Sequence, residues 1–401
     1  MGNLFGKALV KADLFIRRHL TAILMSVINT VVLLFGTYLL NNLTRFTGED
    51  LAQYALVEWT KDKLGMSGEP GELPLYVNVA YDKQLVDVYD DDSLLLGNRD
   101  ITDRSKLLGL LRQLAETNDY RYIFLDVRFE RGYASENDSA LFRQIREMPR
   151  MVVVRHEDME MQDSSIIGKT GLNEYYSTIT STNFVRYPYL IGDSATMPLM
   201  AYRSIDGGDI TRYLGCVYTD QGRLCHRSLF LHFPIREYTE YDDDGEKIYY
   251  NLGADSLFVP AGYVTELARD KVVVIGNMVD DVHDTHIGLQ PGPVITYLAY
   301  DALPKGEHLV KPWLVIVLAL LFFCVSLSLF SHLSLFDRLP LFRSVHSHTL
   351  RFLMSFIGYT FVLTVFSILL CFFFNVAIST LCPSLYFALQ KVIIHYRRIR
   401  P

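Results

Sequence analysis

Long apolar runs occur once near the start of the chain and in a group near its end. The first covers 20–42, and two more cover 313–333 and 352–374. Each is close to the ~20 residues that an α-helix needs to cross about 30 Å of hydrocarbon. A fourth run, 376–394, is less apolar and contains Pro383, which a transmembrane helix tolerates where its neighbours satisfy the freed carbonyl. The pattern predicts four transmembrane helices.

The segment 43–311, between the first two runs, has shorter periodic patterns. Apolar runs of strand length alternate with apolar stripes of helical spacing, which is typical of a parallel sheet with right-handed crossovers. The predicted strands are 75–81, 121–129, 151–154 and 271–276, and the predicted helices are 103–118, 137–148, 260–269 and 293–302. The sequence therefore predicts an α/β domain with a central, largely parallel sheet, in addition to the four transmembrane helices.

One part of this segment, 165–255, has a different character. Tyrosine, threonine and turn residues dominate it, which predicts an antiparallel hairpin insertion. The turn Asp220-Gln-Gly222 lies between two cysteines. A two-residue loop with Thr219 opposite Gly222 would place Cys216 opposite Cys225, whereas a bulge at Gly222 would place His226 there. A Cys216–Cys225 disulfide and two separate thiols both fit the pattern.

Charge is divided sharply along the chain. Of the 38 basic and 45 acidic residues, 11 basic and only 2 acidic ones lie in 1–19, in the loop 334–351 and from Lys391 onward. The positive-inside rule places 1–19, 334–351 and the basic tail 395–401 in the cytoplasm, and 43–311 outside the membrane. The outer segment is strongly acidic and would repel phosphates, so nucleic acid is not an expected partner. The basic tail is suited to anionic membrane lipid.

Three acidic residues end or follow predicted strands: Asp82, Asp126 and Asp281. In open α/β sheets, ligands bind beyond the carboxyl ends of the strands, so the three carboxylates together predict a polar cleft. Taken singly, each could instead cap a neighbouring backbone or pair with Arg104 or Arg128.

The stretch DDVHDTHIG, 280–288, adds two histidines. Imidazole and carboxylate groups of His283, Asp284 and His286 are ligand types suited to zinc. A loop lacks the fixed spacing of a helical zinc motif, so a hydrogen-bonded turn is the favoured reading and no metal is assigned. The chain contains no nucleotide-binding glycine motif and no GxSxG motif, so neither a cofactor nor a catalytic residue is predicted.

Several stretches together resemble the CHASE2 family of extracytoplasmic sensor domains. They are VAYD, LGNRDITDRSKLLGLLRQL, YRYIFLDVRF, ENDSALFRQI and KVVVIGNMVDDVHDTHIGLQPGPVITYLAYDAL, in this order between one N-terminal and several C-terminal spans. The likeness covers about 45–394. The positions that match the family pattern are Asp82, Arg104, Asp126, Asp138, Gly276, Asp281, His283, Thr285, Gly288, Pro291 and Gly292. His286 departs from the usual proline, and Tyr297 lies near the usual histidine.

The resemblance implies an input module in a bacterial inner membrane, with 43–311 in the periplasm. Six of its positions are the candidate ligand-binding residues: Asp82, Arg104, Asp126, Asp281, His283 and Thr285. Family members usually carry a fused output domain, whereas this sequence reaches Pro401 soon after the last span. We therefore expect a sensor or adaptor that relays an unidentified extracytoplasmic ligand to a separate protein. The alternatives are a docking subunit of an envelope complex and a metal-dependent enzyme on the outer face.

Overall fold

A computed structural model of the chain describes residues 2–43, 49–66, 73–90, 92, 94–174, 184, 186–233, 238, 240–241, 245, 247–258, 262–331, 347–374 and 376–399. The chain divides into two compact units, one formed by Met1–Lys61 with Val310–Pro401 and the other by Asp62–Leu309. Most of the predicted cytoplasmic loop 334–351 and the last two residues of the predicted basic tail lie outside the described residues.

Among the described residues, the first unit consists mainly of five helices: α1 (Gly2–Asn41), α2 (Glu49–Lys63), α9 (Pro312–Phe330), α11 (His348–Phe374) and α12 (Leu381–Ile399). Three contain segments long and apolar enough to cross a membrane: Leu20–Asn41, Pro312–Phe330 and Thr349–Phe374. Helix α1 packs along α9, and α11 packs against α12. Their shared core includes Leu33, Phe322, Leu363 and Phe387. Three of the predicted spans are thus confirmed as apolar helices of sufficient length.

The fourth predicted span differs from the other three. Its apolar helix covers only Leu381–Ile394, which at 1.5 Å per residue is about 21 Å long. The preceding residues 376–380 are irregular, and their backbone is bonded by side chains instead. Ser367 Oγ accepts from the amide of Ile378 at 2.9 Å, and Tyr54 OH accepts from Ala377 at 3.3 Å. Irregular backbone within a membrane requires such internal partners.

A buried polar cluster joins three helices of this unit. Asn29 of α1 donates from Nδ2 to Ser326 Oγ of α9 at 2.7 Å. Its Oδ1 accepts from Tyr386 OH at 2.6 Å and from Gln390 Nε2 at 2.7 Å, both on α12. Sequence inspection predicts an interhelical hydrogen bond for Asn29, and this is confirmed.

The second unit is built on a six-stranded, wholly parallel sheet in the order β14-β1-β15-β4-β5-β6. The strands are β1 (Leu75–Asn78), β4 (Tyr122–Asp126), β5 (Met151–Arg155), β6 (Thr170–Leu172), β14 (Tyr249–Asn251) and β15 (Val272–Gly276). The parallel sheet predicted from the sequence is confirmed. Two of its strands, β6 and β14, come from the region predicted to be antiparallel.

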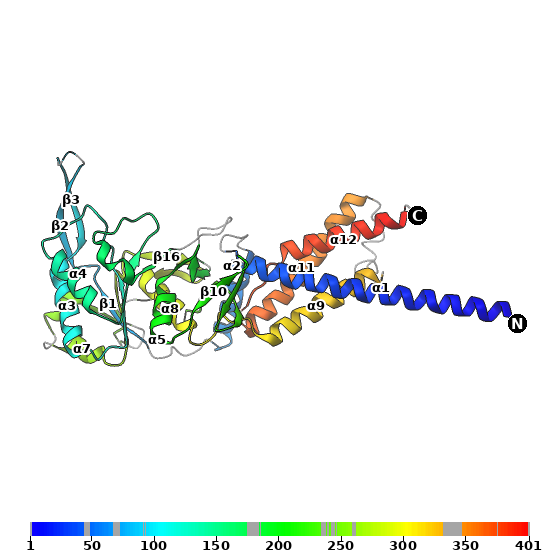
Figure 1. The fold of residues 1–401 in the computed structure, drawn as a ribbon, viewed down its shortest axis with the longest axis horizontal. Coiled ribbons are helices and arrows are strands. Elements are labelled where there is room, and N and C mark those ends of the chain that lie inside the picture. The colour runs from blue at the N-terminus through cyan, green and yellow to red at the C-terminus, as the bar shows by residue number, and fades with distance from the viewer. Residues whose placement is uncertain are drawn as a thin grey trace. The chain divides into compact units, whose positions relative to one another are not determined.

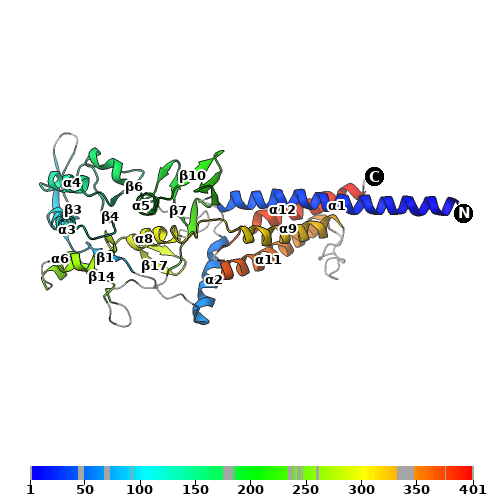
Figure 2. The same cartoon turned by 60° about the horizontal axis from the view of Figure 1, so that its bottom comes forward.

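Helices cover both faces of this sheet (Figures 1 and 2). Helices α3 (Arg104–Thr117), α4 (Asp138–Glu147) and α7 (Tyr263–Leu267) lie on one face, and α5 (Met197–Ile205) and α8 (Gly292–Ala302) lie on the other. Successive side chains of a strand point to opposite faces. In β4, Ile123 and Leu125 therefore pack with α3 and α4, while Tyr122 and Phe124 pack with α5 and α8. This double coverage explains why the strands are continuously apolar.

Helix α3 begins where the sequence predicts. The side chain of Asp103 accepts from the amides of Ser105 and Lys106, which is an N-cap. The helix presents Leu107, Leu111 and Leu114 to the sheet. The helix ends at Asn118, whose left-handed backbone terminates it.

Short strands form the predicted hairpin insertion and other ribbons. They are β2 (Lys83–Tyr89) with β3 (Leu95–Thr102), β7 (Arg186–Pro188) with β13 (Ser228–Phe230), β8 (Leu190–Ile191) with β9 (Ser194–Ala195), β16 (Val282–Thr285) with β17 (Gly288–Pro291), and the sheet of β10 (Ile210–Tyr213), β11 (Val217–Asp220) and β12 (Arg223–Cys225). The β2–β3 ribbon projects beyond the helices of its unit (Figure 1).

The hairpin register corrects the disulfide hypothesis. Asp220 pairs with Arg223 across a two-residue loop, so Tyr218 lies opposite Cys225. This register is shifted by two residues from the one that would bring Cys216 and Cys225 together. Both cysteines remain thiols, and Cys225 is buried.

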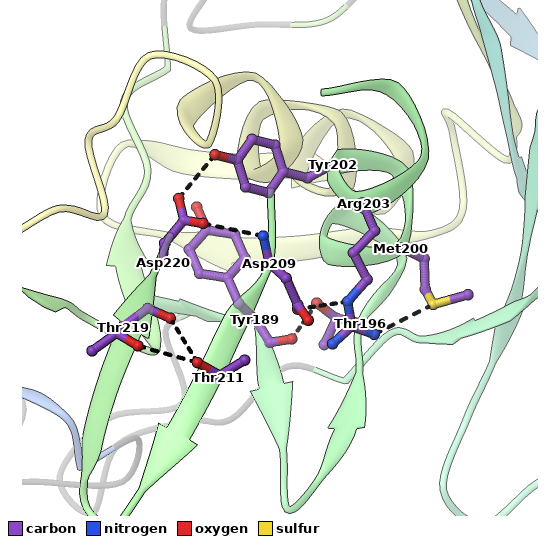
Figure 3. Close-up of polar contacts among 9 residues, drawn as sticks. All are labelled: Tyr189, Thr196, Met200, Tyr202, Arg203, Asp209, Thr211, Thr219 and Asp220. Atoms are coloured by element: carbon purple, nitrogen blue, oxygen red, sulfur yellow. Dashed lines mark hydrogen bonds and ion pairs between the residues drawn. The ribbon is translucent and has the colours of Figure 1, made fainter. Parts of the chain in front are cut away.

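A buried carboxylate attaches this hairpin to its surroundings (Figure 3). Asp220 Oδ2 accepts from Tyr202 OH of α5 at 2.9 Å, and Oδ1 accepts from the amide of Asp209 at 3.1 Å. His308 Nε2 lies 3.0 Å from the same Oδ2, and both side chains are fully buried. His308 directly precedes Leu309, which forms a β-bridge with Cys225.

Candidate functional site

The sheet has a topological switch point between β15 and β4. The connection after β4 leads to α4 on one face, whereas the connection after β15 leads through the β16–β17 hairpin to α8 on the other. Connections that diverge in this way leave a crevice at the carboxyl ends of the two strands, where α/β proteins bind ligands. A cleft of about 620 Å³ lies there, lined by Val79, Lys83, Arg99, Asp100, Ile101, Thr102, Arg104, Asp126, Val127, Arg128, Glu130, Tyr133, His156, Asn173, Glu174, Asn277, Asp280, Asp281 and His283.

Asp126 is the last residue of β4. Its Oδ2 accepts from Asn173 Nδ2 at 3.2 Å, and Asn173 is itself held by Tyr187 OH at 2.8 Å and by Thr296 of α8. Burial, together with the nearby Asp281 carboxylate, raises the pKa of Asp126 well above its usual value, and the Asn173 hydrogen bond lowers it in part. Ionisation of Asp126 is therefore disfavoured, and a cation placed beside this carboxyl would favour it.

Asp281 and His283 form the other wall at this point. Asp281 Oδ1 lies 3.2 Å from His283 Nε2. The pair packs against the first residue of α8, because a Cβ on Gly292 would lie 2.5 Å from Asp281 Oδ2 and 3.2 Å from His283 Nε2. The amide of Gly292 donates to the backbone carbonyl of Asp281 at 2.7 Å. Glycine at position 292 is thus required for the close approach of the hairpin to the helix.

Arg104, at the start of α3, supplies a buried cation to the cleft. Only 2% of Arg104 is exposed. Its Nη2 donates to the carbonyl of Arg128 at 3.0 Å, its guanidinium lies 4.4 Å from the Phe129 ring, and Nε is 3.5 Å from Asp138 Oδ1. Among the described residues, Nη1 has no hydrogen-bond partner. Burial lowers the pKa of Arg104 to about 10, and Asp138 opposes that shift.

The structure places the predicted site residues in two groups. Asp126, Asp281, His283 and Arg104 line one cleft. Asp82 does not line it. Its carboxylate accepts from Lys106 Nζ at 2.7 Å and from the amide of Gly253 at 2.9 Å.

Thr285 is also separate from the cleft lining. Its hydroxyl donates to the carbonyl of Gly288 at 2.7 Å, inside the turn of the β16–β17 hairpin. Asp82 and Thr285 thus have the environments of structural residues.

The candidate metal ligands of the 280–288 stretch do not converge. His283 and Asp284 are successive residues of β16, so their side chains point to opposite faces of the ribbon. His286 lies beyond the strand, with its ring 5.7 Å from that of Phe233. Within the described ranges, no group of three His, Cys, Asp or Glu side chains has an arrangement that could hold a metal ion.

Sequence reasoning missed several lining residues that follow strands. His156 comes directly after β5 and Asn173 directly after β6, and Asn277 and Asp280 follow β15. The rule that identified Asp126 would have identified them as well. Asn173 was overlooked because β6 has only three residues and lies in a region that reads as antiparallel.

Comparison of the chain with family models, with curated proteins and with solved structures gave no match in any of the three.

Proposed function

We propose that this protein is a membrane-anchored sensor or adaptor of the CHASE2 type, whose outer domain binds a small ligand in the cleft between β15 and β4. In this proposal four membrane helices carry the signal to a separate protein in a bacterial inner membrane, and both termini lie in the cytoplasm. The observation that carries the proposal is the cleft itself, which combines a switch-point position with a buried arginine and a carboxyl of raised pKa.

A screen of small molecules against the purified full chain tests this proposal. Ligand that binds only the folded protein raises the midpoint of thermal unfolding. We expect at least one compound from a panel of sugars, amino acids, organic acids, nucleotides and phosphates to raise the midpoint. The shift should disappear in Asp126→Asn and persist in Asp119→Asn, a matched control at the exposed entry to β4. Shifts that are the same in both variants, or no shift with any compound, would reject the cleft as the input site.

The β2–β3 ribbon favours a second candidate function, a docking subunit of an envelope complex. Its exposed apolar side chains are Leu85, Tyr89, Leu94, Leu95 and Leu96, of which Leu85 is 74% exposed. Exposed apolar side chains gathered on one ribbon, with Tyr89 paired to Leu95, are typical of a protein contact. Cross-linking in native membranes distinguishes the two functions. A partner captured by wild type but not by Leu95→Lys, with no small molecule bound in the cleft, would favour docking.

A further inference from the structure

We infer that the ligand of this cleft is a small organic zwitterion, a free amino acid or a short peptide, with its carboxylate at Arg104 and its ammonium group at Asp126 and Asp281. This inference rests on the proposed function and adds the chemical class of the ligand. It follows from a buried arginine and a half-buried aspartate that line one cleft, together with Asp281, whose side chain is 43% exposed.

The anionic end of the ligand is assigned from Arg104. A guanidinium is a rigid fork of donors that matches a carboxylate in two parallel hydrogen bonds. The Phe129 ring and the Arg128 carbonyl fix the plane of this fork. Asp138 is the nearest acid, but its Oδ1 lies 3.5 Å from Nε, beyond the usual length of a charge-assisted hydrogen bond. A carboxylate from solution would supply the acceptor that Nη1 lacks among the described residues.

The cationic end is assigned from Asp126 and Asp281, which line the same cleft as Arg104. The Asp281 carboxylate is close enough to disfavour ionisation of Asp126, while 43% of the Asp281 side chain is itself exposed. Among the described residues, the side-chain hydrogen bond to Asp126 comes from the amide of Asn173, which is neutral. An ammonium group carries three donors and a positive charge, so it would satisfy both carboxyls at once.

The rest of the cleft excludes simpler ions as preferred ligands. Its Lys and Arg residues are Lys83, Arg99, Arg104 and Arg128, and its acids are Asp100, Asp126, Glu130, Glu174, Asp280 and Asp281. A phosphate would meet the carboxylates, and a metal cation would meet the guanidinium groups. Val79, Val127, Ile101 and the Tyr133 ring add apolar contact surface for a side chain. The volume of about 620 Å³ is in the range of small-molecule sites.

Matched analogues test each half of the assignment on the detergent-solubilised full chain. The probes are the twenty amino acids and a set of dipeptides, each compared with its N-acetyl derivative and its C-terminal amide, by thermal unfolding and calorimetry. We expect a zwitterion to bind and both singly charged analogues to bind about tenfold or more weakly. Equal binding of the N-acetyl derivative would overturn the ammonium site, and equal binding of the amide would overturn the role of Arg104.

Variants separate this inference from the proposed function. Asp126→Asn should weaken the binding of the zwitterion about tenfold or more, whereas Asp119→Asn should bind it as tightly as wild type does. Arg104→Lys keeps the positive charge but loses the paired donors of the guanidinium. It should therefore weaken the binding of the zwitterion more than the binding of its C-terminal amide. If another class of compound binds and Asp126→Asn abolishes that binding, the zwitterion is rejected and the sensor proposal stands. If no compound of any class binds, both are rejected.

Discussion

At the scale of single residues, Asp126 gives the outer domain a defined pH dependence. Its pKa in the folded protein is raised by burial and by Asp281, so the unfolded chain releases this proton at lower pH than the folded one. The contribution of Asp126 to stability is therefore complete below the unfolded pKa of about 3.9 and is lost as pH rises through the folded pKa.

Thermal unfolding of wild type and Asp126→Asn between about pH 4 and pH 8 checks this sign. Without ligand, the variant should gain stability relative to wild type as pH rises, because asparagine carries no charge to bury. Asp119→Asn should show no such trend. A constant difference between wild type and Asp126→Asn across the range would contradict a raised pKa.

The rule that ligands bind at the carboxyl ends of strands explains how far the site could be predicted. Asp126 and Asp281 were identified because each follows a recognisable apolar strand. Asp82 also follows a strand, yet its carboxylate accepts hydrogen bonds from Lys106 and Gly253 and does not line the cleft. These partners lie 24 and 171 residues away, and nothing in the sequence near Asp82 reveals them. Pairing over such distances depends on the fold and not on a local pattern.

At the scale of elements, the Asn29 cluster connects α1 to α9 and α12. Asn29→Ala removes four interhelical hydrogen bonds, each worth about 0.6 kcal/mol on average within membranes, so we expect a loss of about 2 kcal/mol. Denaturation in mixed micelles with a rising fraction of ionic detergent measures this loss.

Thr30→Val is the matched control, because Thr30 donates only within its own helix, to the carbonyl of Ser26. Equal losses in Asn29→Ala and Thr30→Val would mean that the cluster does not hold the helices together. Sequence inspection identified Asn29 but missed Gln390 as its partner, since Gln390 lies near the end of the apolar run, where a polar residue is expected to meet the interface.

The buried Asp220 holds the β10–β12 sheet against α5 and the segment before α9. Asp220→Asn weakens the hydrogen bonds of Oδ2 with Tyr202 OH and His308 Nε2. The buried polar groups of these two side chains then lack a charged acceptor. We expect a cost of about 3 kcal/mol, measured as a lower midpoint of unfolding.

Asp209→Asn provides the comparison for Asp220→Asn in the same region (Figure 3). Asp209 pairs with Arg203 at 2.7 Å at the surface, where such a pair contributes about 0–1 kcal/mol. Similar losses of stability in the two variants would show that the buried Asp220 carboxylate contributes no more than a surface ion pair.

At the scale of the whole molecule, charge and hydropathy predict an orientation that labelling can test. In variants with a single cysteine, Cys216 should react with a membrane-impermeant maleimide on intact cells, because 43–311 is expected outside. A cysteine introduced by Ser344→Cys, in the loop 334–351, should react only after the membrane is opened. The reverse pattern would place the acidic domain in the cytoplasm.

The division into a membrane unit and an α/β unit could be predicted because it depends on composition and on long periodic runs. The strand order could not be predicted from the sequence, because β1 pairs with strands about 170 and 200 residues further along the chain. The apolar helix in the fourth predicted span is shorter than the sequence predicts and covers Leu381–Ile394. Hydropathy averages over residues 376–380, whereas their hydroxyl partners hold them in an irregular path.

The β-bridge between Cys225 and Leu309 ties the β10–β12 sheet to the last residue of the second unit. Leu309 is bridged to Cys225 and α9 begins at Pro312, so only Val310 and Lys311 separate a fixed strand from the helix. Two residues span about 7 Å at most, and the residue before a proline has a restricted backbone. A displacement of the β10–β12 sheet within the second unit must therefore either break this bridge or move Leu309 with it.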